Sequence, residues 1–178
     1  MLKLSAVTSP VPPGITIRSF TPHDAEVCRH LYHEALIGGH LPANDTALDI
    51  DDIENAYMRL PGGHFWVAEN ERGEVVGMIG VQQMESSEGE IRRLRVRHDH
   101  RRRGIGSALL ETAIRHCREW QHLKIKLDTF IEREPAIKLF EKLKFRLTRT
   151  REVGGKTLLY FYLDLYSSDR RPPPDKPS

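Results

Sequence analysis

Apolar and polar positions along the chain follow two periods, and each change of period marks an expected element. Alternation with a period of two predicts strands, whereas apolar positions three and four residues apart predict amphipathic helices. Strands are expected over 15–20, 64–69, 74–84, 90–96, 123–130, 145–153 and 156–166. Helices are expected from Thr21 to the Gly38-Gly39 pair and over 46–60, 104–120 and 135–143. The order of elements is therefore β-α-α-β-β-β-α-β-α-β-β.

The length and composition predict one folded domain. The chain has 178 residues, of which 39% are apolar and 29% are charged, as is typical of soluble globular proteins. Residues 1–14 carry several prolines and are expected to form an irregular leader. The domain is expected to occupy 15–166, and the proline-rich, charged tail over 167–178 is expected to be disordered.

Charge and cysteine content narrow the expected partners and compartment. The net charge of +2 argues against nucleic-acid binding as the main role, because a domain-wide basic excess is its usual footprint. No apolar run approaches the roughly 18 residues that span a bilayer, and the first residues lack a long signal core. Cys28 and Cys117 have no cysteine close by in sequence, which indicates two reduced thiols. We therefore expect a cytoplasmic protein without a nucleic-acid or membrane partner.

The segment 96–107 joins an expected strand to an expected helix through a loop rich in arginine and glycine. The first N–H groups of a helix have no partner inside the helix, and the helix dipole places partial positive charge there. Gly104 and Gly106 allow the backbone to approach a phosphate that a Cβ would obstruct. The segment predicts an anion site. A charged surface loop without a ligand is the alternative.

Arg101-Arg102-Arg103-Gly104-Ile105-Gly106 resembles the Arg/Gln-x-x-Gly-x-Gly/Ala signature of the GCN5-related N-acetyltransferase (GNAT) family. The resemblance covers 15–165 and implies an α/β (α+β) fold, with a central mixed, mostly antiparallel, twisted sheet of about seven strands flanked by about four helices. It implies acetyl-CoA as co-substrate and acetyl transfer to a primary amine of a small molecule or peptide in a ternary complex. The implied cofactor-binding residues are Leu94, Arg95, Val96, Arg101, Arg102, Arg103, Gly104, Ile105, Gly106, Ser107 and Arg133.

Residues 133–145 resemble a second motif of the family, Asn-x-x-Ala-x-x-Leu-Tyr-x-x-x-Gly-Phe. Three positions fit: Ala136, Leu139 and Phe145. Arg133 stands where asparagine is usual, and Lys144 stands where glycine is usual, which indicates a less strained helix end. Phe140 replaces a tyrosine that in many members protonates the departing thiolate. Because a phenyl ring cannot donate a proton, Tyr160, Tyr162 or water is left for this step, and sheet packing is the alternative role of both tyrosines.

The resemblance also places a general base and an oxyanion donor. An alkyl amine must lose a proton before it attacks a thioester at neutral pH. Glu90 lies eleven residues before Arg101, the offset of the catalytic glutamate in the histone-acetylating branch of the family. Strand parity places it on the face of Leu94 and Val96 if no bulge intervenes, and an N–H of one of these two would hold the oxyanion. A surface carboxylate paired with an arginine is the alternative, and Glu88 and Glu85 are further candidates for the base.

Other features bear on metal, acceptor and assembly. His98-Asp99-His100 lacks a third ligand at a standard spacing, so no metal is expected. An acidic rim favours a cationic acceptor and comprises Asp45, Asp49, Asp51, Asp52 and Glu54. The segment 158–162 also resembles the camello-like branch, whose membrane anchor is not expected here. A homodimer is possible by analogy, and a non-catalytic module that binds CoA or nucleic acid is the alternative function.

Overall fold

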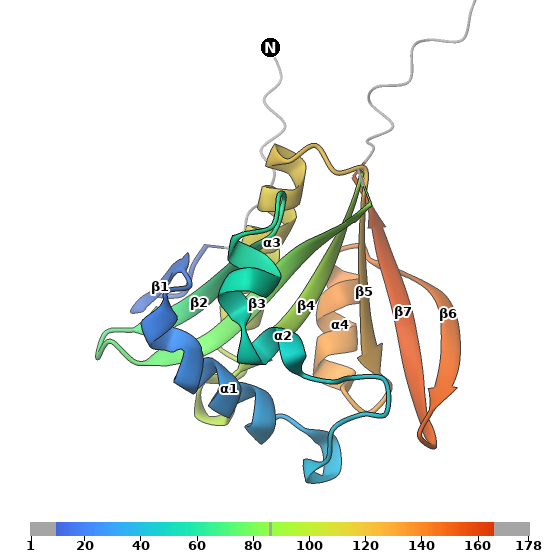
Figure 1. Cartoon of the computed structure of the whole chain (residues 1–178), viewed down its shortest axis with the longest axis horizontal. Coiled ribbons are helices and arrows are strands. Elements are labelled where there is room, and N and C mark those ends of the chain that lie inside the picture. Colours follow the sequence, from blue (N-terminus) through green and yellow to red (C-terminus); the bar gives the residue numbers. More distant parts are fainter. Residues whose placement is uncertain (1–9, 86, 166–178) are drawn as a thin grey trace, which may run out of the picture.

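A seven-stranded mixed sheet runs through the molecule in the order β1-β2-β3-β4-β5-β7-β6 (Figure 1). The structure is a computed structural model, and it describes residues 10–85 and 87–165. The strands are β1 (Ile15–Ser19), β2 (His64–Asn70), β3 (Val75–Glu85), β4 (Glu88–Val96), β5 (Lys124–Phe130), β6 (Arg146–Val153) and β7 (Lys156–Asp164). Neighbouring strands are antiparallel, except that β4 and β5 are parallel. The expected mixed, mostly antiparallel sheet is confirmed.

Helices cover both faces of this sheet and enclose two apolar cores. Helices α1 (Ala25–Glu34) and α2 (Leu48–Asp51) lie in front of the sheet in Figure 1, while α3 (Ile105–Glu119) and α4 (Glu134–Lys142) lie behind it. The front core includes Leu31, Ile50 and Met78, and the rear core includes Leu109, Ile125 and Phe140. Helices α1, α3 and α4 each contribute a stripe of apolar positions, as the helical period predicts.

The prediction of one continuous helix over 46–60 is wrong, because the helix is interrupted in its middle. The structure has the single turn α2 (Leu48–Asp51) and then a π-helical segment, η3 (Glu54–Met58). Asp52 separates them with φ −141°, and its carboxylate accepts hydrogen bonds from the backbone and side chain of Asn55. Short acidic side chains compete with the helix for backbone N–H groups, which explains the interruption.

The end of α4 also differs from the prediction. Lys144 has φ +70°, so the position where the family motif has glycine is left-handed and strained. The N–H of Phe145 donates to the carbonyl of Phe140 at 3.0 Å, which closes a Schellman-type helix end around Lys144. The absence of glycine therefore does not relax this helix end.

Candidate functional site

Strands β4 and β5 separate shortly after they begin to pair. Their ladder contains only Glu88 with Lys124, Gly89 with Ile125 and Glu90 with Lys126. Beyond these pairs β4 continues to Val96 and β5 to Phe130, and Figure 1 shows the two strands diverging. We call the facing edges of residues 91–96 and 127–130 the β4–β5 fork. The fork exposes strand edges in the middle of the sheet, where an extended chain of amides can add as a strand.

The backbone of β4 presents donors and acceptors to this fork. Arg97 N–H donates to the carbonyl of Val76 at 2.8 Å, so Arg97 faces β3. Backbone groups alternate in direction along a strand, which turns the N–H and C=O of Val96 and Leu94 toward β5. This orientation suits both roles predicted for the two residues, cofactor pairing and oxyanion binding.

A β-bulge at Arg93 changes which side chains share a face of β4. Arg93 has φ +62°, and the register with β3 gains one residue on β4 between Arg92 and Arg95. Leu94 and Val96 consequently pack with Ile91 against the rear core, while Glu90 lies on the front face. The prediction that Glu90 shares a face with Leu94 and Val96 is wrong, because it required an unbulged strand.

The bulge is held by a buried ion-pair network. The Arg93 guanidinium donates to both carboxylates of Asp45 and Asp49, and its carbon lies 4.9 Å from the centre of the Tyr32 ring. Tyr32 and Tyr57 donate to Asp45 and Asp49, respectively. Desolvation raises the pKa of Asp45, but the hydrogen bonds from Arg93 and Tyr32 outweigh it and leave that pKa far below its usual range. Two members of the predicted acidic rim are therefore neutralised inside the protein.

Glu90 has the environment of a general base. Its side chain is 24% exposed, and its Oε1 lies 3.8 Å from Nε of Arg92. Desolvation raises the pKa of Glu90, Arg92 opposes this, and the nearby Asp128 carboxylate raises it further. A carboxylate with a raised pKa accepts a proton more readily, as a general base must. The predicted face of Glu90 is wrong, and its role as the general base stays a prediction.

Tyr160 lies on the same face of the sheet as Glu90. The pairs Glu90–Lys126 and Asp128–Tyr160 place all four residues on that face, since directly paired residues share a side. The guanidinium carbon of Arg149 lies 4.2 Å from the centre of the Tyr160 ring. Asp128 is not among the site residues predicted from the sequence, although its position two residues after Lys126 on an alternating strand places both side chains on one face.

Phe140 has a side chain that cannot donate a proton, and it is buried in the rear core. The residue is 4% exposed, and its ring packs 5.9 Å from Phe145 and 5.8 Å from Phe161. It belongs to the rear core, behind β5 and β7. The acid step therefore has no donor at this position.

The glycine loop ends at the start of α3, beside the fork. A short 3-10 turn, η4 (His98–His100), leads into Arg102 with φ +63° and Gly104 with φ +84°. Ala108 N–H donates to the Gly104 carbonyl at 3.0 Å and is the first helical hydrogen bond, so three preceding N–H groups stand at the helix start. Those groups belong to Ile105, Gly106 and Ser107, three of the predicted phosphate-binding residues. Gly104 needs the freedom of glycine here because of its positive φ.

The side chains of this loop contribute unequally. Arg102 and Arg103 are exposed, whereas Ile105 is 1% exposed and can contribute only its backbone. Arg101 Nε donates to the Val96 carbonyl at 3.0 Å, and Ser107 donates to Glu111 at 3.4 Å. The fit for a phosphate therefore rests on backbone donors with arginines around them.

Arg133 reaches toward α1 from the start of α4. Its guanidinium donates to the Ala35 carbonyl at 2.6 Å, just past the end of α1. Desolvation lowers the pKa of Arg133, and the positive charge of Arg101 lowers it further. Arg133 therefore lies within electrostatic reach of Arg101 in the glycine loop, and its place in cofactor binding stays a prediction.

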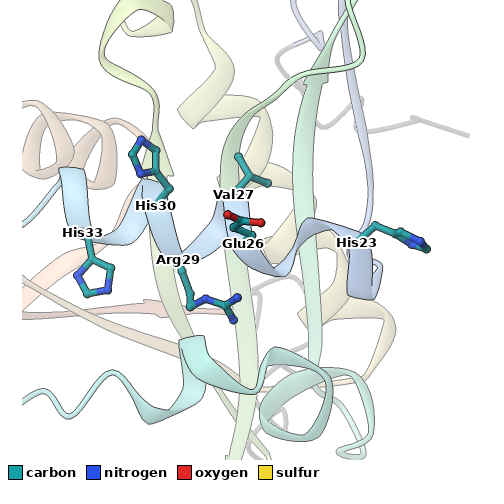
Figure 2. Close-up of a pocket in the computed structure, with 6 residues that line it drawn as sticks. All are labelled: His23, Glu26, Val27, Arg29, His30 and His33. Carbon is teal, nitrogen blue, oxygen red and sulfur yellow. The ribbon is translucent and has the colours of Figure 1, made fainter.

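The described residues outside the fork offer no comparable site. Figure 2 shows an open depression along η1 (Pro22–Asp24) and α1, whose side chains spread along the two elements without converging: His23, Glu26, Val27, Arg29, His30 and His33. Within residues 10–85 and 87–165, no group of three or more His, Cys, Asp or Glu side chains is arranged to hold a metal ion. Nor does any helix in these ranges have the length and apolar character to cross a bilayer.

Comparison with known proteins identifies the family. The sequence profile of the acetyltransferase (GNAT) family matches residues 26–145, about two thirds of the chain. The chain belongs to the GNAT family. Human N-acetyltransferase 8 is 33% identical over 105 residues, which cover 56% of this chain and 46% of that protein. The N-acetylaspartate synthetase of Xenopus tropicalis is 36% identical over 121 residues, covering 66% and 43%. The chain thus spans about half the length of these curated relatives.

Solved GNAT structures share the fold. An acetyltransferase of the GNAT family from Staphylococcus aureus Mu50 superposes with a TM-score of 0.76 at 22% identity, covering 85% of this chain and 99% of that one. The Salmonella typhimurium protein yncA, solved with its cofactor acetyl-CoA, superposes with a TM-score of 0.71 at 21% identity, covering 85% and 94%. The GNAT fold therefore accounts for the seven strands and for the parallel β4–β5 pair.

Proposed function

We propose that the protein is an N-acetyltransferase that moves an acetyl group from acetyl-CoA to a primary amine of a small molecule or peptide, by direct attack in a ternary complex. One observation carries the proposal. The β4–β5 fork opens beside the left-handed Gly104 and the first N–H groups of α3. An extended amide chain ending in a pyrophosphate needs this combination of a strand edge and a helix start.

Glu90 takes the proton of the attacking amine. The neutral amine nitrogen then forms a bond to the acetyl carbon and gives up a further proton to solvent as the amide forms, and the bond from that carbon to sulfur breaks. Glu90 suits this step because desolvation raises its pKa toward the operating pH. Backbone N–H groups of Leu94 and Val96 face the fork and stabilise negative charge on the carbonyl oxygen.

The departing thiolate takes its proton from Tyr160 or from water. A thiol with a pKa of about 8.5 leaves with little assistance, so the phenyl ring of Phe140 at the usual tyrosine position does not prevent turnover. Tyr160 shares the face of Glu90 and lies opposite Asp128 on β5. Most of the acceleration then comes from holding amine and thioester together, with a smaller share from proton transfer.

Screening amine acceptors for the release of free thiol from acetyl-CoA tests the proposal. We expect thiol release with at least one class of primary amine, in a one-to-one ratio with acetylated product. The names of the two curated relatives describe N-acetylation, which supports an amine acceptor. Acetyl-CoA binding without thiol release from any small amine or lysine-bearing peptide would instead support the non-catalytic alternative.

We further propose that the protein is cytoplasmic and has neither nucleic-acid nor membrane partners; a homodimer is also compatible with the family. The support for the compartment is that Cys28 and Cys117 are both free and buried. Burial raises the pKa of each thiol to about 12, so neither is reactive in the folded protein. Localisation of the tagged chain by fluorescence microscopy and its mass by light scattering test these points.

A further inference from the structure

Three guanidinium groups near the β4–β5 fork each donate to a backbone carbonyl, and Arg133 interacts electrostatically with the other two. Arg95 donates to Leu94 at 2.8 Å, Arg101 donates to Val96 at 3.0 Å, and Arg133 donates to Ala35 at 2.6 Å. Among residues 10–85 and 87–165, no ion pair joins any of the three to a carboxylate. The carbonyls of Leu94 and Val96 face the fork, so Arg95 and Arg101 lie along the exposed edge of β4.

Arg95 differs from its neighbour Arg93 in how its charge is compensated. Arg93 is paired with Asp45 and Asp49, and those pairings use both oxygens of Asp45. Nε of Arg95 is buried and has no hydrogen-bond partner in the described part of the chain. Desolvation lowers the pKa of Arg95 to about 9, and repulsion from Arg133 and Arg93 contributes. A buried cation without a counter-ion lowers the stability of the folded protein, and a bound anion would compensate its charge.

We propose that Arg95 and Arg133 form a second oxyanion subsite of the fork, separate from the backbone donors at the start of α3. The proposal rests on the acetyltransferase function proposed above. Arg95 follows the bulge and precedes Val96, so its side chain lies on the front face, the opposite side to the core of α3. Arg133 reaches the same side, since it donates to the residue after α1.

The chemistry of the subsite is that of a carboxylate or a phosphate. A guanidinium offers a planar fork of N–H donors that matches two oxygens of either group. Two guanidiniums from different elements, β4 and the start of α4, can hold one such group between them. The anion belongs either to the acceptor, as a carboxylate near the reacting amine, or to the cofactor, as one of its phosphates.

Arg95→Met separates these sources and distinguishes a ligand site from a structural role. Methionine removes the charge and keeps most of the volume, so we expect the melting temperature of the unliganded variant to be unchanged or raised. Arg133→Gln provides a second variant at a less buried position. Arg115→Met is the matched control, because Arg115 is exposed on α3 and distant in sequence from the fork.

Two arms identify the anion. In the first, calorimetric titration with acetyl-CoA and with S-acetylpantetheine, which lacks phosphates, compares wild type with both variants. A tenfold or larger loss confined to acetyl-CoA assigns the subsite to a phosphate. In the second, thiol release is measured with L-phenylalanine and 2-phenylethylamine, and with L-lysine and cadaverine. A tenfold or larger rise in KM confined to the carboxylate-bearing member of a pair assigns the subsite to the acceptor.

The inference is overturned if neither arm changes in Arg95→Met and Arg133→Gln, or if both variants melt well below wild type and lose all ligands equally. Failure of the proposed function has a different signature. In that case the wild type binds acetyl-CoA and releases no thiol with any amine, while the cofactor arm of the comparison still reports on the subsite.

Discussion

At the scale of single residues, the role proposed for Glu90 as a general base depends on its burial and on the charges near it. It is three-quarters covered, faces the front of the sheet, and lies near Arg92 and Asp128. The bulge at Arg93 leaves Glu90 on the front face while Leu94 and Val96 turn to the rear. One extra residue in β4 thus places the proposed base on the face opposite to the side chains of Leu94 and Val96.

Glu90→Gln removes the carboxylate proposed as the general base and keeps the shape of the side chain. We expect kcat to fall by about a hundredfold or more, which is the usual contribution of a positioned base. The wild-type value of kcat/KM should fall as the pH drops below the raised pKa of Glu90, and the variant should lose that acidic limb. Glu141→Gln, at an exposed position on α4, is the control and should retain the wild-type profile. An unchanged profile in Glu90→Gln would assign the base to another group.

Lys144 has a backbone conformation that suits glycine better than lysine. A left-handed non-glycine residue costs about 1–2 kcal/mol, and glycine recovers part of this after its larger entropy loss on folding. Lys144→Gly should therefore raise the free energy of unfolding by about 0.5–1 kcal/mol, measured by urea denaturation. Lys138→Gly, exposed within α4, should lower it by about 1 kcal/mol. A loss of stability in Lys144→Gly would contradict the left-handed helix end.

At the scale of elements, the segment around α2 is ordered by its contact with β4 more than by its own helical propensity. Asp45 precedes the single turn α2, Asp49 lies within it, and both bind Arg93 on the bulge. Tyr32 of α1 and Tyr57 of η3 complete the network. The same contacts hold the front helices against the strand that carries the fork.

Removing the arginine of this network leaves two carboxylates without their cation. Arg93→Met should lower the free energy of unfolding by about 3–5 kcal/mol, because removing one partner of a buried ion pair leaves the opposite charge buried and uncompensated. Arg92→Met should cost far less, because Arg92 is one-third exposed and its contacts are longer, 3.2 Å to Gln82 and 3.8 Å to Glu90. Equal, small losses in both variants would show that the network does not hold α2.

The sequence predicted most elements but not the details that shape the site. Within the described residues, period-two and period-3.6 patterns located β1 to β7, α1, α3 and α4. Most of these elements bury one face, whereas β6 is exposed over nearly its whole length. The same patterns gave an unbroken helix over 46–60, since they do not register side chains such as Asp52 that bond to the local backbone. They also gave an unbulged β4, because an extra residue is fixed by tertiary partners, here Asp45 and Asp49. The glycine loop was predictable, because the left-handed backbone at position 104 favours glycine and that glycine is visible in the sequence.

At the scale of the whole molecule, two cores back a sheet that is continuous except at the fork. His122 lies at the rear, 3% exposed, with both ring nitrogens lacking partners in the described part of the chain. Desolvation lowers the pKa of His122 below its ordinary value, and His116 contributes. The unfolded chain then binds this proton more readily than the folded one. Stability is complete above the ordinary pKa of about 6.5 and is lost as the pH falls below it.

His122→Leu tests this dependence. Between pH 7 and pH 5 the wild type should lose stability with a slope of up to about 1.4 kcal/mol per pH unit from this group. The difference between wild type and variant isolates His122 from His64, whose pKa is also lowered, chiefly by desolvation. Urea denaturation at several pH values provides the measurement. Parallel curves for the two proteins would show that His122 does not titrate across this range.

The central claim is that the β4–β5 fork and the start of α3 together hold a pantetheine arm and its pyrophosphate. Calorimetric titration of the wild-type protein with acetyl-CoA and with S-acetylpantetheine tests it most directly. The account predicts one-to-one binding of acetyl-CoA in the micromolar range, and at least tenfold weaker binding of S-acetylpantetheine, equivalent to about 1.4 kcal/mol from the phosphates. No detectable binding of acetyl-CoA at millimolar concentration, or equal affinity for the two compounds, would contradict it.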